Sequence, residues 1–314
     1  MELRPASGDW KDIDAGLLRL HLEFEEDFRL DLPQLLLLRR EVNRAAKALA
    51  KMRSGDECRS LRLLTAPPPS DDPQVRRYLA KPPVPYVLRP VPGLPRILTA
   101  GDSLDLDFFL FGGGRELAAT LIDLFVYIGE CGFCNGEGKF SLSRVSVVDE
   151  RGEAVAVWCP GQVWTSPQWP LFFFDREPQL LPGQRGAIRF ITPARLMRRG
   201  KPLFRPSLAQ LFPFIVRRVC GMCHYWCGVD LLADPGDFFA NLPQEDIRGG
   251  LQWRDWRTLS GDRGEQPVGG LVGRIAVPAE WLAYGAPFFM LGARLNLGKG
   301  AACGAGAWEL VLEP

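Results

Sequence analysis

The sequence predicts an α+β protein in which the order β-α-β-β-α-β occurs twice. Segments whose apolar residues alternate with polar ones, the pattern of half-buried strands, recur in both halves of the 314-residue chain. Apolar stretches rich in helix formers lie between these segments. The chain also contains 33 glycines and 27 prolines, which indicates many turns between short elements.

The first half begins with a strand and a basic helix. In residues 17–25, leucine and phenylalanine alternate with Arg19, His21 and two glutamates, which predicts a strand with one buried face. Pro33 stands where a helix tolerates proline, and a glycine follows the last helix former, so we predict a helix over 33–53. A strand pair, a helix and a further strand are then predicted at 85–90, 104–111, 116–129 and 139–148.

The second half repeats this order. Its strand, helix, hairpin strands, helix and last strand are predicted at 186–196, 207–220, 251–259, 270–277, 278–295 and 307–312. Each unit is a ferredoxin-like fold, a four-stranded antiparallel sheet with two helices on one face. We therefore predict domains at 1–150 and 185–314. They are joined by an aromatic and proline-rich linker at 151–184, whose aromatic residues are expected to pack between the domains.

Composition excludes several classes of protein. With 38 basic and 37 acidic residues the net charge is +1, which excludes a globally basic nucleic-acid coat protein. No apolar run reaches 18 residues and the amino terminus lacks the apolar core of a signal peptide. We therefore expect a cytoplasmic protein without membrane contact. Eight cysteines are too few for a disulfide scaffold and favour thiols or metal ligands.

Basic charge is concentrated in two tracts. The helix at 33–53 carries six basic residues against the single acid Glu41. Residues 185–218 contain nine basic residues and no acid. Solvated faces usually mix both signs, so the tracts predict a groove for a polyanion, although the helix alone could be an ordinary solvated face. The candidate phosphate-binding residues in the two tracts are Arg39, Arg44, Lys47, Arg195, Arg198, Arg199 and Lys201.

A glycine-rich loop lies between the last predicted helix and the last strand. Glycines let backbone N–H groups approach a phosphate closely, and a lysine adds a positive charge. The spacing matches neither a P-loop nor a dinucleotide fingerprint, because the glycines follow a helix. We predict a phosphate-binding loop formed by Gly298, Lys299, Gly300, Gly304 and Gly306.

Two Cys-x-x-Cys pairs offer a different interpretation. Cys131 and Cys134 form one pair, and Cys220 and Cys223 form the other, each after a predicted helix. Together they could complete a tetrahedral zinc site, but their separation is wider than in a zinc ribbon. No cofactor is therefore predicted. The alternative is a zinc ion that staples the two domains of a scaffold protein whose basic tracts are merely solvated.

At its carboxy-terminal end the sequence resembles a known family. Residues 269–311 resemble the signature of the repeat-associated (RAMP) endoribonucleases that process precursor CRISPR RNA, with a glycine-initiated strand, a helix and a G-x-G-x-x-x-G-x-G loop. The resemblance extends over about 84–314. The first helix departs from the family, because it is arginine-rich and lacks the usual glycine. Further matching segments are PYVLRP at 85–90, ECGFCNGEGKFSLSRV at 130–145 and FITPARL at 190–196.

The resemblance implies two tandem RAMP domains and a metal-independent endoribonuclease. In that family a ribose 2′-OH of the CRISPR repeat attacks the adjacent phosphate and leaves a 2′,3′-cyclic phosphate and a 5′-OH. The expected partners are the repeat RNA or mature crRNA and other subunits of a CRISPR effector complex. The alternative is a noncatalytic RAMP subunit that binds guide RNA, since one fold serves both kinds of subunit.

The proton-transfer steps are suited to histidine, whose pKa lies near 6.5. The chain has only two, His21 and His224. Family members often place the general base near the first strand or helix, so His21 is the candidate, assisted by Arg19 and Arg40. His21 and Arg19 are expected to face away from the helices, and His21 could instead be a solvated strand residue. A site without histidine, in which Arg19, Arg39 and Arg40 orient the RNA, stays open.

Overall fold

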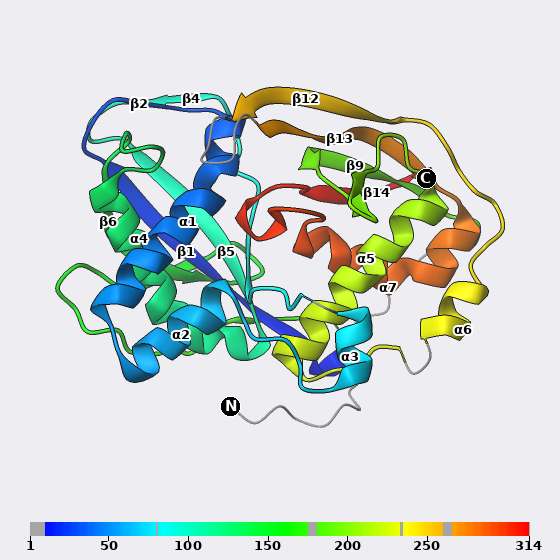
Figure 1. Cartoon of the computed structure of the whole chain (residues 1–314), viewed down its shortest axis with the longest axis horizontal. Coiled ribbons are helices and arrows are strands. Elements are labelled where there is room, and N and C mark those ends of the chain that lie inside the picture. Colours follow the sequence, from blue (N-terminus) through cyan, green and yellow to red (C-terminus); the bar gives the residue numbers. More distant parts are fainter. Residues whose placement is uncertain (1–9, 80, 175–180, 233–234, 260–265, 314) are drawn as a thin grey trace.

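The computed structural model describes residues 10–79, 81–174, 181–232, 235–259 and 266–313. It contains two main antiparallel sheets, one in each half of the chain, with helices packed against each (Figure 1). In both sheets the strands follow the spatial order of a ferredoxin-like unit, in which the first and third strands occupy the centre. The predicted fold class is confirmed. No helix in the described part of the chain is long and apolar enough to cross a membrane.

The first sheet surrounds the long strand β1. Leu18, Leu20 and Leu22 of β1 are fully buried, and Leu18 lies opposite Phe108, whose ring packs on Phe125 of the helical layer. The sheet order is β3-β5-β1-β6-β7, with β8 paired to the start of β1. Its strands are β1 (Asp14–Phe24), β3 (Tyr86–Leu88), β5 (Ser103–Phe111), β6 (Phe140–Val148), β7 (Ala154–Trp158) and β8 (Leu171–Phe173).

Helices cover one face of this sheet. The predicted basic helix is α1 (Leu32–Met52), and a capping box between Asp31 and Gln34 fixes its start. Its buried side chains include Leu38 and Val42, as the helical period predicts, whereas Arg39 and Arg40 are exposed. The other elements of this half are η1 (Trp10–Asp12), β2 (Phe28–Leu30), α2 (Gly55–Thr65), α3 (Pro73–Tyr78), β4 (Arg96–Leu98), η2 (Gly112–Leu117) and α4 (Ala118–Cys131).

The second half repeats the arrangement with the sheet order β12-β13-β9-β14. The predicted hairpin is present as β12 and β13, and its loop at 260–265 lies outside the described residues. The strands are β9 (Arg185–Ala194), β12 (Leu251–Leu259), β13 (Gln266–Val277) and β14 (Trp308–Glu313), with a small hairpin of β10 (Met197–Arg198) and β11 (Lys201–Pro202). The helical elements are α5 (Leu208–Met222), η3 (Cys223–Cys227), α6 (Pro235–Ala240), α7 (Ala279–Leu295) and η4 (Ala301–Cys303).

The segment at 151–184, expected to be a linker, contributes strands to the first sheet. β7 pairs with β6 and β8 pairs with β1. Phe172 packs edge-on against Phe109 at 5.1 Å between ring centroids, and Phe174 stacks on Phe111. These aromatic residues therefore cover the first sheet, because it also carries apolar side chains on the face opposite the helices. Residues 175–180 of the segment lie outside the described residues.

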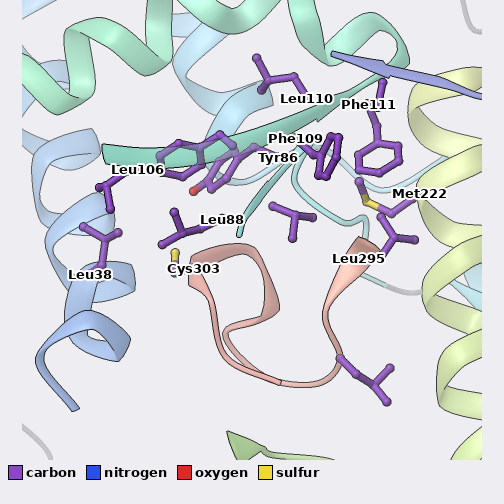
Figure 2. Close-up of a cluster of buried hydrophobic side chains, with 14 of the residues drawn as sticks. Leu38, Tyr86, Leu88, Leu106, Phe109, Leu110, Phe111, Met222, Leu295 and Cys303 are labelled. Carbon is purple, nitrogen blue, oxygen red and sulfur yellow. The ribbon is translucent and has the colours of Figure 1, made fainter. Parts of the chain in front are cut away.

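The two halves share one hydrophobic core. Figure 2 shows Cys303 of the second half beside Leu88 of the first, and Leu295 and Met222 of the second half near Phe111 of the first. The π-helical turn η3 adds polar contacts between the halves. Its Tyr225 hydroxyl accepts a hydrogen bond from the Ser70 backbone N–H at 2.9 Å, and its Trp226 indole donates to the Pro83 carbonyl at 2.8 Å. The side chains of both halves are thus held in fixed relative positions.

Candidate nucleic-acid interface

The loop at 297–306 joins α7 to β14 and lies between α1 and the second sheet (Figure 1). Its backbone requires glycine. Gly298, Gly300, Gly304 and Gly306 all have positive φ angles, of 92°, 89°, 88° and 64°. A Cβ atom on Gly306 would also collide with the carbonyl of Leu297. The four glycines singled out in the sequence therefore determine the path of this loop.

Most backbone N–H groups of the loop donate hydrogen bonds inside the protein, but those of Gly298, Gly300 and Ala302 have no acceptor among the described residues. Leu297 N donates to Gly306 O at 2.8 Å, which closes the loop, and Lys299 N donates to Arg195 O at 2.9 Å. Within the described residues, the N–H groups of Gly298 and Gly300 donate to no protein acceptor. They stand on either side of Lys299. Two such N–H donors beside an ammonium group form the kind of arrangement that binds phosphate.

Positive charge from both halves surrounds Lys299. Burial lowers the pKa of Lys299, and the positive charges of Arg195, Arg39 and Lys81 lower it further. Arg39 comes from α1, Arg195 follows β9, and Lys81 precedes β3. No carboxylate in the described parts of the chain forms an ion pair with Lys299 or Arg39. Mutual repulsion of these cations favours a bound anion. We call Arg39, Lys81, Arg195 and Lys299 the loop cluster.

Two buried contacts hold the glycine loop against the first half. The Asn296 side-chain N–H group donates to Leu88 O and to Ala301 O, both at 3.0 Å. The hydroxyl of Tyr86 hydrogen-bonds the Cys303 thiol, and burial raises the pKa of that thiol to about 12, so it stays protonated. The loop is therefore fixed relative to β3 and α1.

The remaining basic residues predicted to bind RNA fall into two groups. Arg198, Arg199 and Lys201 are exposed on the β10–β11 hairpin, which begins just after Arg195 and so extends the basic surface. On α1, Arg40 bonds Asn135, and Arg44 lies 3.6 Å from Glu41, so both side chains are directed to groups of the first half. Lys47 is exposed one turn further along α1.

His21 and Arg19 lie together on the other face of the first sheet, as the period of two predicts. Arg19 donates to both oxygens of Asp107, at 2.7 and 2.8 Å. His21 Nδ1 lies 2.7 Å from Asp105 Oδ1, and Nε2 lies 3.0 Å from Ser146 Oγ. The His21 side chain is 12% exposed.

The predicted catalytic trio of His21, Arg19 and Arg40 is consequently divided. Successive residues of a strand point to opposite faces, and α1 packs on the face that carries the leucines of β1. The sheet therefore separates Arg40 from the other two. A histidine on this strand and a residue on that helix do not meet at one phosphate.

The cysteine pairs do not combine into a metal site. Cys131 ends α4 and Cys134 lies in the turn after it in the first half, whereas Cys220 and Cys223 lie in α5 and η3. In the described ranges no group of three or more histidine, cysteine or acidic side chains is placed to hold a metal ion. His224, which follows the second pair, bonds Asp230 through Nδ1 at 2.6 Å.

Two side chains of the site, those of Lys81 and Asn296, were not identified from the sequence. Lys81 stands alone in a proline-rich stretch without a periodic pattern. Asn296 precedes the glycine loop with φ of 49°, and asparagine is one of the few residues that adopt this conformation. An asparagine between a helix and a glycine-rich loop is the signal that could have marked it.

Two ferredoxin-like units, the second of which carries a glycine loop beside a cluster of cations, resemble the arrangement of RAMP proteins. Residues 188–308 match the family model described as CRISPR-associated endoribonuclease Cas6. This match covers much of the second half of the chain, which is therefore similar to the Cas6 endoribonucleases. Residues 18–169 match a second model, described as an N-terminal domain. No curated protein matches the chain.

Solved Cas6 structures share this fold at low sequence identity. Thermus thermophilus Cas6 (TTHB231) is 13% identical with a TM-score of 0.51, and the match covers 95% of this chain and 99% of that chain. A product complex of Cas6 (TTHB231) is 15% identical with a TM-score of 0.50 and the same coverage. A partial Cas6-RT-Cas1–Cas2 complex is 11% identical with a TM-score of 0.56, and all of this chain matches 47% of that longer chain.

Proposed function

We propose that this protein cleaves the repeat RNA of precursor CRISPR transcripts at the surface formed by α1 and the glycine loop. The observation that carries the proposal is the position of Lys299. Its side chain stands beside Arg39 and Arg195, and the unused N–H groups of Gly298 and Gly300 flank it. A phosphodiester is an anion suited to Lys299 and Arg39, since neither forms an ion pair with a carboxylate of the described residues. The product complex of a Cas6 relative with the same fold supports RNA as the ligand.

The proposed reaction is metal-independent. The ribose 2′-OH attacks the neighbouring phosphorus, the P–O5′ bond breaks, and the products carry a 2′,3′-cyclic phosphate and a 5′-OH. Lys299 and Arg39 stabilise the negative charge of the phosphorane. The lowered pKa of Lys299 makes its ammonium group a better proton donor toward the leaving 5′ oxygen than an ordinary lysine. The bound RNA supplies the in-line geometry.

His21 is a separate candidate for the base. Asp105 orients its ring, but both ring nitrogens already have partners, and the sheet lies between His21 and the loop cluster. If His21 removes the 2′ proton, His21→Ala spares RNA binding and slows cleavage by about 100-fold or more. Single-turnover cleavage of repeat RNA measures this rate. A rate equal to that of the wild type assigns the chemistry to the loop cluster.

A second function, a noncatalytic guide-RNA-binding subunit, is favoured by one observation. Both histidines of the chain hydrogen-bond carboxylates, His21 with Asp105 and His224 with Asp230, and neither lies on α1. A binding subunit would keep the basic surface and need no base. The two functions therefore predict a similar affinity for repeat RNA, but only the first predicts that the RNA is cut.

Cleavage of repeat RNA by the purified protein in EDTA separates these functions. The matched substrate carries a single 2′-deoxy sugar at the cut site. A discrete cut that disappears with the deoxy sugar supports 2′-OH attack without metal. Tight binding to both substrates without a cut supports the guide-RNA-binding subunit. A cut that persists with the deoxy sugar contradicts the proposed reaction.

We further propose that the protein retains its product and delivers it to other CRISPR proteins. The basic hairpin and the loop cluster contact phosphates that are still present after the cut. The Cas6 relative in the Cas6-RT-Cas1–Cas2 complex assembles with other CRISPR proteins. Slow release of the cleaved stem, measured by competition, is the expected result.

A further inference from the structure

An exposed pair of aromatic side chains in the second half has no use in the proposed reaction. Phe204 follows the β10–β11 hairpin, and its ring meets that of Trp253 on β12 edge-on, with 5.1 Å between the ring centroids. Phe204 is 54% exposed. The Trp253 indole N–H donates to Asp255 Oδ1 at 2.7 Å, which fixes the orientation of the ring. The two residues, which we call the aromatic pair, therefore present ring surface to the solvent.

The hairpin places the aromatic pair beside the loop cluster. The Leu203 N–H group donates to Leu196 O at 3.0 Å, which closes the base of the β10–β11 hairpin. The next residues of the two arms are Phe204 and Arg195, so the hairpin brings these two residues next to each other. Arg195 O in turn accepts from Lys299 N at 2.9 Å. Phe204 is thus separated from Lys299 by a single residue of the loop cluster.

The second sheet independently places Trp253 at the same end. Trp253 pairs with Leu271 of β13, and Leu271 pairs with Ala194 of β9. Ala194 is the residue before Arg195. The strand register and the hairpin therefore agree on the position of the aromatic pair.

The charge around the aromatic pair is positive. Residues 195–205 contain five basic residues and no acid. Four of the five are exposed and form no ion pair with a carboxylate of the described residues, namely Arg198, Arg199, Lys201 and Arg205. Asp255 is the carboxylate at the pair, and it accepts from the indole of Trp253. A ligand suited to this surface combines negative charge with a flat ring that can stack on an aromatic side chain.

We propose that Phe204 and Trp253 form a stacking platform for one unpaired base of the bound RNA, close to the phosphate at the loop cluster. This identification of the ligand rests on the proposed function. A base stacked on Phe204 leaves the phosphates of its nucleotide to the cations of the hairpin, and single-stranded nucleic acids are bound by this combination of stacking and charge. Every base has a face that can stack, so the platform recognises that a base is unpaired and not which base it is.

The test removes the base and the aromatic ring in turn. In a series of repeat RNAs, one unpaired nucleotide at a time is replaced by an abasic nucleotide, which keeps its phosphate. Wild-type protein should lose about 10-fold in affinity at one position near the cut. Phe204→Leu should bind the intact RNA about 10-fold more weakly and lose nothing further at that position, because the stacking partner is already absent. Phe204→Tyr keeps the ring and should behave as the wild type.

The matched control is Phe173→Leu. Phe173 is 52% exposed on β8 of the first sheet. This variant should bind the intact RNA as the wild type does, and it should show the same loss with the abasic RNA. A second measurement follows affinity over a series of salt concentrations. Phe204→Leu should keep the slope of log affinity against log salt, because it removes no phosphate contact, whereas Lys299→Ala should lower the slope.

Three outcomes decide against the platform. It is overturned if Phe204→Leu binds the intact RNA as the wild type does, even where the variant unfolds at a lower temperature, since the aromatic pair then serves packing alone. It is also overturned if every abasic substitution costs Phe204→Leu as much as it costs the wild type. A lower salt slope for Lys299→Ala shows in both cases that the proposed RNA groove survives. Absence of binding between wild-type protein and repeat RNA overturns the proposed function itself, and the platform with it.

Discussion

Each of the two ferredoxin-like units carries a glycine-rich loop between its second helix and its last strand. The loops differ in whether a carboxylate of the protein accepts hydrogen bonds from their backbone N–H groups. In the first loop, Gly138 N and Lys139 N both donate to one oxygen of Glu26, at 2.7 and 3.1 Å. In the second loop, the N–H groups of Gly298 and Gly300 have no acceptor among the described residues, and the nearby charges are positive. A glycine-rich loop thus makes an internal contact with a carboxylate in one unit, and in the other it carries the anion site that we propose.

The largest expected effect distinguishes the lysines of the two loops. Lys299→Ala should slow cleavage by about 100-fold, since removal of a donor that stabilises transition-state charge costs about that much. Lys139→Ala, which removes the lysine of the first loop, should leave the rate unchanged. Single-turnover cleavage of repeat RNA measures both. Equal rates for the two variants would contradict the assignment of the open anion site to the second loop.

The next effect concerns the acid that occupies the first loop. Glu26→Ala should lower the free energy of unfolding by about 1–3 kcal/mol, because it leaves two backbone N–H groups without their charged acceptor. Chemical denaturation measures the change, and Glu25→Ala is the control because its exposed side chain makes none of these bonds. Cleavage by the folded variant should match the wild type; a slowed reaction would mean that the first loop also contacts RNA.

A smaller effect is expected for two arginines of α1 whose side chains point to different neighbours. Arg39→Ala should lower the slope of log affinity against log salt by about 0.7, the value for one contact with single-stranded RNA. Arg44→Ala should have less effect, because Arg44 faces Glu41. Filter binding at several salt concentrations measures both slopes. A larger decrease for Arg44 would place the RNA along α4 and away from the glycine loop.

The smallest expected effect is a pH dependence of RNA binding. The pKa of Lys299 is lowered in the free protein, and a bound phosphate raises it again, so affinity is complete below the lowered pKa and falls as pH rises through it. Lys299→Arg should keep its affinity to higher pH, because arginine stays protonated. Binding measured from about pH 7 to about pH 10 tests this, and identical profiles for the two proteins would contradict it.

The fold could be predicted because its signals are local. Alternation in β1 and the helical period of α1 correctly gave the buried faces, and both depend only on neighbouring residues. The same alternation placed His21 and Arg19 away from the helices, so Arg40 could not belong with them. The structure divides the candidate catalytic trio. The face of His21 and Arg19 was predicted correctly, but Arg40 was grouped with them although its helix packs on the opposite face of the sheet.

The site could be predicted only in part. Each glycine of the loop and Lys299 could be identified, since positive φ angles and a lysine leave a mark in the sequence. Lys81 could not, because tertiary packing alone brings it to the loop cluster. The strands β7 and β8 were missed for a similar reason, because their pairing with the first sheet depends on apolar residues far away in the sequence.

The side chain of Asn296 has a consequence for the thermodynamics of RNA association. Because its amide joins the loop to Leu88, the loop backbone that carries Lys299 cannot move relative to β3 unless buried hydrogen bonds break. The entropic cost of assembling the cations is therefore met during folding and not at each encounter with RNA. Such preorganisation means that the protein loses little conformational entropy when it binds a phosphate, and the two halves keep one orientation through successive encounters.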